Sequence, residues 1–416
     1  MDRAPSPGVL MLVERLEALG RLGRYEAGID RPLATASERA ARELFAAWAR
    51  DGGYALSQDE AGNLFARREG GERDAPPILV GSHLDTVKTG GAYDGAYGVV
   101  GAMCALDRLS QDRVEMQHPV VAVAWVGEEG SRFPLGCLGS SVFAGITTAA
   151  DALALCDERG LSLRDALASG EGARLPDVPA YAERRVAAYL ELHIEQGPTL
   201  EDAGARLGLV TAIVGQRRLR VDVIGRSGHA GTVPMAGRSD ALCAAAELIL
   251  ALEDEAKRQG EAVVTVGRIT VEPGGTNVIP AKATFTIDVR SPDDSKIETI
   301  LVRLREEVGH VSLRRGVQVK TTVLEARKPT PMDASLRAAL ERAVANLGQR
   351  TVEPPSGAGH DAMCLATIAP AAMLFVPSIG GHSHVGEERT SEADLLLGLD
   401  ALVASIVEVD RVLEGR

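Results

Sequence analysis

Residues 77–102 read PILVGSHLDTVKTGGAYDGAYGVVGA, and this stretch decides the fold of the chain. The apolar run at residues 78–80 predicts a buried strand, which leads into a segment that carries His83, Asp85 and Asp94. Buried parallel strands that end in polar, glycine-rich loops are where open α/β sheets place their sites. A divalent metal could take His83 and Asp94 as ligands, and Asp85 could accept the other imidazole N–H and fix its tautomer. For these residues alone, a glycine-rich turn with solvated acids is the alternative.

The composition is that of an ordinary globular protein with an aliphatic core. The chain has 416 residues, too many for one compact core, so two domains are expected. Its net charge of −13 argues against nonspecific nucleic-acid binding, which needs clustered Lys and Arg. We expect no membrane span, because no apolar run reaches about 18 residues, and no signal peptide, because the N-terminus has acid and proline in its place. The five cysteines lack metal-type spacing and are expected to be reduced core residues of a cytoplasmic protein.

Two further apolar segments end in polar side chains. Residues 120–126 (VVAVAWV) form a continuous apolar run that leads into Glu128 and Glu129, and residues 188–195 (AYLELHIE) alternate and carry His193. Because parallel strands end at the same edge of a sheet, we expect all three polar clusters at one site. Successive side chains at a strand end point opposite ways, so one glutamate could bind a metal while the other acts as a base. A solvated turn is the alternative for the glutamate pair.

From about residue 217 the pattern changes to that of an inserted domain. Strands are expected at 218–225, 262–271, 282–290 and 317–326, and helices at 239–258 and 295–308. This order, strand–helix–strand–strand–helix–strand, is the split βαβ or ferredoxin-like arrangement. The prediction is an α/β protein whose metal-binding catalytic domain has the dinuclear-metal aminopeptidase-like fold. That domain is expected at residues 1–212 and 329–416, with a dimerisation or lid domain at residues 213–328.

The plausible metal ligands of the larger domain are His83, Asp94, Glu129, His193 and His384. Nitrogen and carboxylate oxygen suit zinc, manganese, cobalt or nickel, and the lack of a cysteine cluster argues against a structural zinc site. Five protein ligands are too many for a single catalytic zinc with an open position. They fit two metals that share one bridging carboxylate, with Asp94 as the natural bridge.

The motifs of the chain resemble those of the dinuclear metallo-aminoacylase/carboxypeptidase superfamily, and more narrowly its hydantoinase/carbamoylase family of amidases. The matching segments are GSHLDTV, GGAYDGAYGV, GEEGSRF, HIEQGP, GHAGT, GTNVIP, DVRSP, GAGHDAM and GHSHV, in family order over residues 81–385. This family contains N-carbamoyl-L-amino-acid hydrolases, β-ureidopropionases and allantoate amidohydrolases. A histidine at position 193 is typical of the carbamoylase branch, whereas carboxypeptidases and dipeptidases usually carry an acidic ligand there.

The resemblance implies a role for each matching residue. His83, Asp94 and His193 would bind one metal, and Asp94, Glu129 and His384 the other. Glu128 matches the general base, Asp85 the acid behind the ligands, and His229 a residue that acts on the transition state. Substrate contacts are implied for Gln196, Gln216, His229, Asn277, Arg290, Gly359 and His360. In relatives the positions of His229 and Asn277 reach the site across a dimer interface. The chain departs from the family pattern at Gly127 and His382, which puts the identity of the substrate in question.

The activity implied is metal-dependent hydrolysis of the ureido C–N bond of an N-carbamoyl-L-amino acid, giving the amino acid, ammonia and carbon dioxide. Allantoate amidohydrolase shares every motif and is the alternative, whereas His193 disfavours an aminoacylase or dipeptidase. A catalytically silent binding protein would be expected to lack Glu128. Two divalent metal ions per subunit are implied, zinc first, with manganese, cobalt or nickel as alternatives. The protein is expected to be a homodimer that acts on a small molecule.

Overall fold

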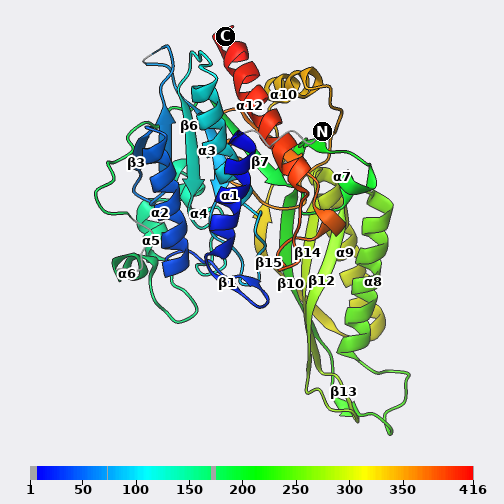
Figure 1. The fold of residues 1–416 in the computed structure, drawn as a ribbon. Helices are drawn as coiled ribbons and strands as arrows, with labels where there is room; N and C mark the ends of the chain where they lie inside the picture. The colour runs from blue at the N-terminus through cyan, green and yellow to red at the C-terminus, as the bar shows by residue number, and fades with distance from the viewer. Residues whose placement is uncertain (1–6, 73, 170–174, 416) are drawn as a thin grey trace. The chain divides into compact units, whose positions relative to one another are not determined.

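The computed structural model describes residues 7–72, 74–169 and 175–415 (Figure 1). The chain forms two compact units. Unit 1 comprises Met1–Thr211 and Met332–Arg416, and unit 2 comprises Ala212–Pro331. Each unit has its own sheet and its own hydrophobic core.

An eight-stranded mixed sheet forms the centre of unit 1. Its order is β17-β8-β18-β7-β5-β6-β4-β3. The strands are β3 (Ala55–Gln58), β4 (Leu64–Arg68), β5 (Ile78–His83), β6 (Val120–Trp125), β7 (Ala188–Ile194), β8 (Leu207–Leu209), β17 (Thr351–Val352) and β18 (Ala371–Val376). The four neighbours β18, β7, β5 and β6 are parallel, so their carboxyl ends lie at one edge of the sheet. Every residue of these four strands is buried, as expected for parallel strands covered on both faces.

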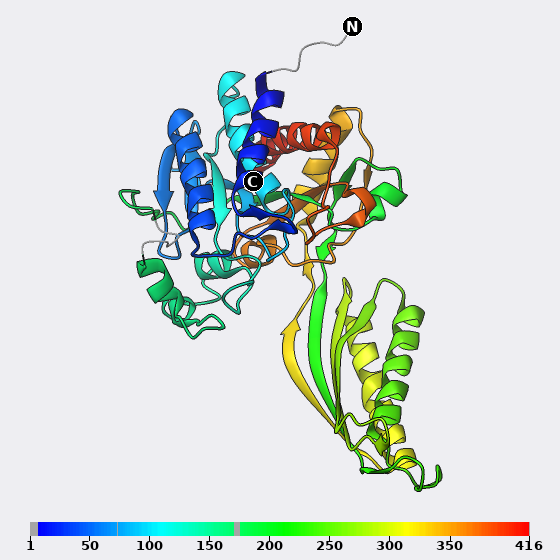
Figure 2. The same cartoon turned by 60° about the horizontal axis from the view of Figure 1, so that its bottom comes forward.

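Helices cover both faces of this sheet (Figures 1 and 2). Alternate residues Ile78 and Val80 of β5 join a core cluster with one set of helices. That set is α1 (Pro7–Arg21), α2 (Ala36–Asp51), α3 (Ala96–Gln111), α10 (Ala334–Asn346) and α12 (Glu392–Glu414). On the other face, Trp125 of β6 packs against Phe143 with ring centroids 5.3 Å apart. Phe143 is the last residue of α4 (Leu138–Phe143). The other short helices on this face are α5 (Ala149–Ala154), α6 (Leu163–Ala168) and α11 (Ala362–Leu365). The sheet thus forms the middle layer of three, as its two-sided burial requires.

The sheet of unit 1 has a topological switch point at β5. From β5 the chain passes to β6 on one side, and the next central strand, β7, lies on the other side of β5. Strands β5 and β7 pair only through Ile78–Val80 and Ala188–Leu190, so they are no longer paired beyond those residues. Open α/β sheets bind ligands at such a point, outside the carboxyl ends of the strands. Here that position lies between His83 and His193.

Unit 2 is a four-stranded antiparallel sheet packed against two helices. Its elements are β10 (Gly215–Ile224), α8 (Ala241–Gln259), β12 (Val263–Glu272), β14 (Lys282–Ser291), α9 (Asp294–Arg315) and β15 (Gln318–Arg327), with the short strands β9 (Ala212–Ile213), β11 (Gly228–His229), β13 (Val278–Ile279) and β16 (Thr330–Pro331). The sheet order is β12-β14-β10-β15. Alternate residues of β14, such as Phe285 and Ile287, are buried in the core with α8 and α9. The predicted ferredoxin-like order of elements is confirmed.

Two expectations need correction. Helix α9 continues to Arg315 instead of ending near residue 308, because Val311 extends the buried stripe that includes Leu304. All five cysteines are free, but Cys156 and Cys243 are exposed and do not belong to the core. Among the helices of the described residues, none combines the length and the apolar character that a membrane span requires.

Candidate metal centre

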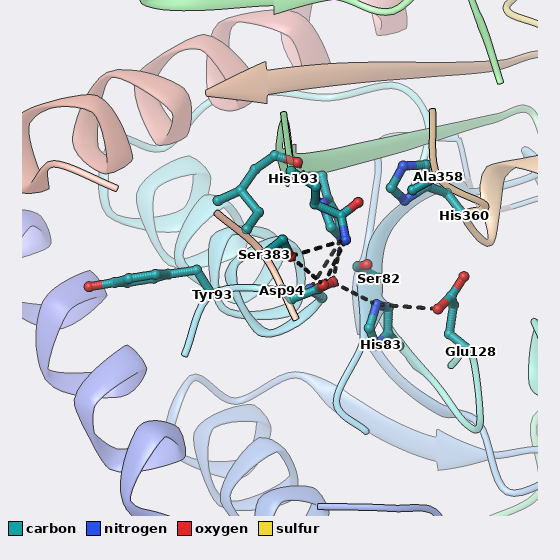
Figure 3. Close-up of polar contacts among 12 residues, drawn as sticks. Ser82, His83, Tyr93, Asp94, Glu128, His193, Ala358, His360 and Ser383 are labelled. Atoms are coloured by element: carbon teal, nitrogen blue, oxygen red, sulfur yellow. Dashed lines mark hydrogen bonds and ion pairs between the residues drawn. The ribbon is translucent and has the colours of Figure 1, made fainter. Parts of the chain in front are cut away.

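Five polar side chains of unit 1 meet at the carboxyl edge of its parallel strands. His83 is the last residue of β5, His193 lies near the end of β7, and Glu129 follows β6. Asp94 precedes α3, and His384 lies on the segment after β18. Figure 3 shows His83 and His193 on either side of Asp94, at the switch point of the sheet. The structure therefore brings together all five residues that the sequence predicts as ligands.

The two carboxylate oxygens of Asp94 face different groups. Oδ1 lies 3.5 Å from Nε2 of His83 and 3.3 Å from Nε2 of His193. Oδ2 lies 3.2 Å from Nε2 of His384, which is itself 3.5 Å from Oε2 of Glu129. Ligand atoms that bind one tetrahedral ion at about 2.0–2.1 Å lie roughly 3.3 Å apart, so each group has the spacing that suits a small divalent cation.

Backbone carbonyls orient two of the imidazoles. Nδ1 of His83 lies 3.0 Å from the carbonyl oxygen of Asp85, and Nδ1 of His193 lies 2.8 Å from that of Ile194. An Nδ1–H that donates to a carbonyl leaves Nε2 as the acceptor, which is the form that binds a metal. The expectation that the Asp85 carboxylate fixes the His83 tautomer is corrected here, because its Oδ1 lies 3.7 Å from Nδ1. The main-chain oxygen of the same residue takes that role.

The Asp85 carboxylate instead holds the pair of glutamates. Its Oδ1 accepts the backbone N–H of Glu128 at 3.1 Å, and its Oδ2 accepts that of Glu129 at 3.2 Å. The two glutamate side chains then diverge. Oε2 of Glu128 lies 3.7 Å from Nε2 of His83, whereas Oε2 of Glu129 faces His384. The side chains diverge as expected, but the cause differs from strand alternation, because β6 ends at Trp125 and both glutamates lie in bends beyond it.

Gly95 allows α3 to begin beside the ligands. Its φ of +63° is in the left-handed region, and a Cβ at this position would collide with the imidazole of His83. Both conditions exclude a side chain. The N–H of Gly95 points to Nε2 of His193 at 3.2 Å.

One predicted ligand and one residue beside the predicted ligands also adopt left-handed backbone without being glycine. Gln196 has φ +62° and His384 has φ +60°. Such conformations cost of order 1–3 kcal/mol each and are found at functional sites. Nε2 of Gln196 donates to Oδ2 of Asp94 at 2.7 Å, and its Oε1 is buried without a hydrogen-bond partner among the described residues. The predicted substrate contact Gln196 therefore lies directly against the central carboxylate.

Burial shifts the pKa of the acidic groups at the site. Burial raises the pKa of Glu128 to about 7, and burial followed by the charge of Asp94 raises the pKa of Glu129 well above its usual value. Although burial opposes it, hydrogen bonds from the surrounding histidines, His193 first, hold the pKa of Asp94 well below its usual value. Several acids and imidazoles are therefore concentrated in one buried site. A divalent cation bound there would stabilise the charged carboxylates.

Known proteins agree with the family that the motifs predict. A match to the family described as Peptidase family M20/M25/M40 spans residues 79–408. The chain belongs to this family. It is 38% identical to the N-carbamoyl-L-amino acid amidohydrolase of Geobacillus stearothermophilus, over 95% of this chain and 97% of that protein. It is 40% identical to the allantoate amidohydrolase of Bacillus subtilis (strain 168), over 83% of this chain and 84% of that protein.

A solved structure agrees with the fold of this M20 chain. The amidase of the hydantoinase/carbamoylase family from Burkholderia multivorans superposes with a TM-score of 0.91 at 34% identity, covering 96% of this chain and 97% of that one. The predicted resemblance and fold class are therefore confirmed. Family membership and the clustered His, Asp and Glu side chains together indicate a hydrolase with a divalent metal site.

Sequence reasoning missed a buried polar layer beneath the ligands of this M20 site. Oε1 of Glu191 accepts a hydrogen bond from Ser82 Oγ at 2.7 Å, and Oε2 accepts the N–H of Ala362 at 3.0 Å. Asp361 accepts a hydrogen bond from Ser140. Glu191 stands two residues before His193 on a buried strand, so the strand period could have placed both side chains on one face.

In unit 1 the predicted substrate residues besides Gln196 are Gly359 and His360. His360 is buried, and its ring packs edge-on against that of His193 with centroids 4.6 Å apart. Its Nε2 lies 2.8 Å from Ser356 Oγ. Burial, followed by the charge of His193, holds the pKa of His360 well below its usual value.

In unit 2, Gln216 and Arg290 are cross-strand neighbours that share Asp288. Arg290 donates to its two oxygens through Nε at 3.0 Å and Nη2 at 3.2 Å, and Gln216 donates through Nε2 at 2.8 Å. His229 and Asn277 also lie together, because strands β11 and β13 pair His229 with Val278. The structure thus places the predicted unit 2 residues in two pairs.

Proposed function

We propose that the chain is a dinuclear metal-dependent amidohydrolase that cleaves the ureido C–N bond of an N-carbamoyl-L-amino acid. One water is consumed, and the amino acid, ammonia and carbon dioxide are released. The observation that carries the proposal is Asp94, whose Oδ1 and Oδ2 each face a separate group of ligands. Likeness over 95% of the chain to an enzyme named N-carbamoyl-L-amino acid amidohydrolase supports the substrate class.

Two groups of residues would hold the ions. The first is His83, Asp94 and His193, and the second is Asp94, Glu129 and His384. This mixture of nitrogen and oxygen donors suits zinc, with manganese, cobalt or nickel as alternatives. Ions bound there would polarise the substrate carbonyl and make water acidic enough to attack near neutral pH.

Glu128 would act as the general base. Its Oε2 lies within 3.7 Å of His83 Nε2, yet Glu128 belongs to neither group of ligands. With a pKa of about 7 in the protein alone, its carboxylate can take a proton from the attacking water and pass it to the leaving nitrogen. The Asp85 carboxylate, which holds the backbone of Glu128, would keep this base in place.

Unit 2 would supply the groups that bind the substrate. Nδ1 of His229 accepts the N–H groups of Gly231 at 3.0 Å and Thr232 at 3.2 Å, so the proton of the neutral ring is on Nε2. That Nε2–H, with the Asn277 amide, would donate to the oxyanion that forms at the substrate carbonyl. The guanidinium of Arg290 would bind the substrate carboxylate through two parallel hydrogen bonds.

The enzyme would work as a homodimer assembled through unit 2. Strands β12 and β15 are the edges of its sheet, and an open edge can be paired or covered by a second copy. In that assembly His229 and Asn277 would act on the site of the partner, as the family resemblance implies.

Hydrolysis of allantoate is the second candidate function. The 40% identity to an allantoate amidohydrolase, over 83% of the chain, supports it. The two candidates share the proposed metal centre and differ in the ureido acid that the substrate groups accept.

One assay separates these candidates. Ammonia release should be measured with a panel of N-carbamoyl-L-amino acids, allantoate and N-acetyl amino acids, alongside the metal content of the protein. The proposal predicts turnover of an N-carbamoyl-L-amino acid, loss of activity on chelation, recovery with a divalent ion, and more than one ion per chain. Preference for allantoate would favour the second candidate, and activity that resists chelation would contradict both.

A substitution tests the base. Glu128→Gln should leave both ions bound but lower kcat by about two to four orders of magnitude, the usual contribution of a positioned acid–base group. Near-normal activity would remove Glu128 from the mechanism. Loss of metal would mean that Glu128 and Glu129 have exchanged roles.

A further inference from the structure

Glu388, which the sequence analysis did not single out, connects the segment of His384 to the loop of Asp94. Its Oε1 accepts the backbone N–H of Tyr93 at 2.9 Å and that of Asp94 at 3.1 Å. Its Oε2 accepts a hydrogen bond from Ser383 Oγ at 2.9 Å. The residue is only 4% exposed, so these groups replace the water that a carboxylate otherwise needs. Figure 3 shows Ser383 against Asp94, with Tyr93 directed away from the ligands.

The two segments are fitted to each other around this carboxylate. A Cβ on Gly91 would collide with the carboxyl group of Glu388, so a residue with a side chain would displace it. Thr89 adds a second link, because its hydroxyl donates to the carbonyl oxygen of His384 at 3.2 Å. The loop before α3 and the segment after β18 therefore hold Asp94 and His384 in a fixed relation.

Ser383 lies between two carboxylates. Its Oγ is 3.1 Å from Oδ2 of Asp94 and 2.9 Å from Oε2 of Glu388. A hydroxyl has one proton to donate, so the two acceptors compete for it. When the proton goes to Glu388, Oδ2 of Asp94 is relieved of one donor on the side that faces His384.

We propose that Glu388 is a positioning residue for the second metal ion, the one assigned above to Asp94, Glu129 and His384. It fixes the backbone of Asp94 and accepts the hydrogen bond of Ser383, so that Oδ2 of Asp94, which Gln196 Nε2 already contacts, has one donor fewer competing with the ion. The inference rests on the proposed dinuclear centre. Residues that hold metal ligands in place typically contribute about 10–100-fold to metal affinity. Loss of Glu388 should therefore weaken the binding of the second ion by that factor.

The test measures zinc per chain by mass spectrometry while a chelator buffers free zinc at graded concentrations. Glu388→Gln is the main variant, because its amide oxygen can still accept the two backbone N–H groups. Its NH₂ group, however, cannot accept the Ser383 proton. We expect the first zinc to bind as in the wild type and the second to bind about 10–100-fold more weakly. Glu388→Ala should lose at least as much.

Asp410 offers a matched control. Its carboxylate accepts two consecutive backbone N–H groups, that of Gln117 at 2.8 Å and that of His118 at 2.9 Å. These residues are almost as distant from Asp410 in sequence as Tyr93 is from Glu388. Asp410 is 3% exposed, and among the described residues its hydrogen-bond partners are Gln117 and His118, not the proposed ligands. Asp410→Ala and Glu388→Ala should both lower the melting temperature, but Asp410→Ala should leave both zinc affinities unchanged.

A double substitution isolates the role of the hydroxyl. Adding Ser383→Ala to Glu388→Gln removes the donor that competes for Asp94, and should restore part of the lost affinity for the second zinc. A merely structural role for Glu388 predicts no such recovery. Wild-type zinc affinities in Glu388→Gln and Glu388→Ala would overturn this inference alone. A wild type that never binds more than one zinc would overturn the dinuclear centre and this inference with it.

Discussion

The carboxylate of Asp85 holds the backbone of Glu128, since Oδ1 of Asp85 accepts the N–H of Glu128 at 3.1 Å. The other oxygen accepts the next N–H along the chain, that of Glu129, at 3.2 Å. The proposed base and the proposed ligand that follows it are thus positioned by the two oxygens of one side chain. Asp85 is 3% exposed, so little water can replace these hydrogen bonds if the side chain is changed.

Asp85→Asn should therefore impair catalysis and metal binding together. An amide keeps one acceptor oxygen, but its NH₂ group would face one of the two backbone N–H groups and repel it. We expect kcat/KM to fall by about 10–100-fold with some loss of metal, the usual effect of a change behind the ligands. Asp410→Asn, which alters a comparable clamp on two backbone N–H groups elsewhere, is the control and should lose stability only. Equal activity losses in the two variants would contradict a positioning role for Asp85.

The stability of the metal-free protein should fall as the pH rises. The pKa of Glu128 is raised from about 4.5 to about 7 by burial, and that of Glu129 is raised well above its usual value. Between the usual pKa of a glutamate and its raised pKa in the protein, the folded state binds more protons than the unfolded chain. Rising pH therefore destabilises the folded state. Burial lowers the pKa of His193, but the hydrogen bond to Asp94 and the charges of Asp94 and Glu191 together raise it above its usual value, and that contribution to stability is lost at higher pH as well.

Melting temperatures of metal-free and zinc-loaded protein, measured at pH 5.5 and pH 8, check this prediction. The difference between the two forms should widen at the higher pH, because the ions favour the deprotonated ligands. Metal-free Glu128→Gln should be less sensitive to pH, because its amide does not titrate. Metal-free stability that is constant or rises over this range would contradict the prediction.

The sequence could predict that these side chains cluster because local pattern determines their position. His83, Glu129 and His193 stand at or near the ends of apolar strands, and the switch point of the sheet then brings the strand ends together. What surrounds the ligands depends on contacts that no local pattern contains. Glu388 meets the N–H of Tyr93 across 295 positions of sequence.

Spacing alone also failed to assign the two oxygen types of Asp85. The spacing of His83 and Asp85 is compatible with a contact from the imidazole to either the carboxylate or the carbonyl oxygen of Asp85. In the folded backbone it is the carbonyl oxygen that faces the ring. The left-handed backbone of Gln196 and His384 had no sequence signal either, because neither residue is glycine. Such local exceptions to propensity occur where function constrains the chain.

Arg290 should discriminate between charged and neutral substrates. Arg290→Ala should raise KM for an N-carbamoyl amino acid and cost roughly 2–5 kcal/mol in kcat/KM, if the ion pair with the substrate is buried. The KM of Arg290→Lys should lie between those of wild type and Arg290→Ala, because lysine offers a point charge instead of a planar guanidinium. The amide of the same substrate, which lacks the carboxylate, should be a poor substrate for wild type and nearly indifferent to Arg290→Ala.

Arg218 provides the control for this prediction. Its Nε also donates to Asp288, at 3.1 Å, but the sequence assigns it no substrate contact. Arg218→Ala should therefore affect charged and neutral substrates alike, and only slightly. If Arg290→Ala harms both substrates equally, Arg290 supports the sheet through Asp288 and does not bind the carboxylate.

Subunit mixing should restore activity if His229 acts on the site of the partner. Glu128→Gln and His229→Ala are each expected to be inactive as homodimers. In a mixed dimer, one site combines an intact Glu128 with an intact His229 from the other chain. Random exchange makes half of the dimers mixed, so roughly a quarter of wild-type activity should return.

The control pairs Glu128→Gln with His83→Ala, two changes in unit 1 that leave every site of the mixed dimer with one defect. No activity should return in that mixture, although subunit exchange, followed with two affinity tags, proceeds to the same extent. Recovery with His229→Ala but not with His83→Ala would require the histidine of one chain to complete the site of another. Failure of both mixtures after verified exchange would place His229 in the site of its own chain or outside catalysis. The intermolecular oxyanion donor would then have to be abandoned, while the ligands of unit 1 would be unaffected.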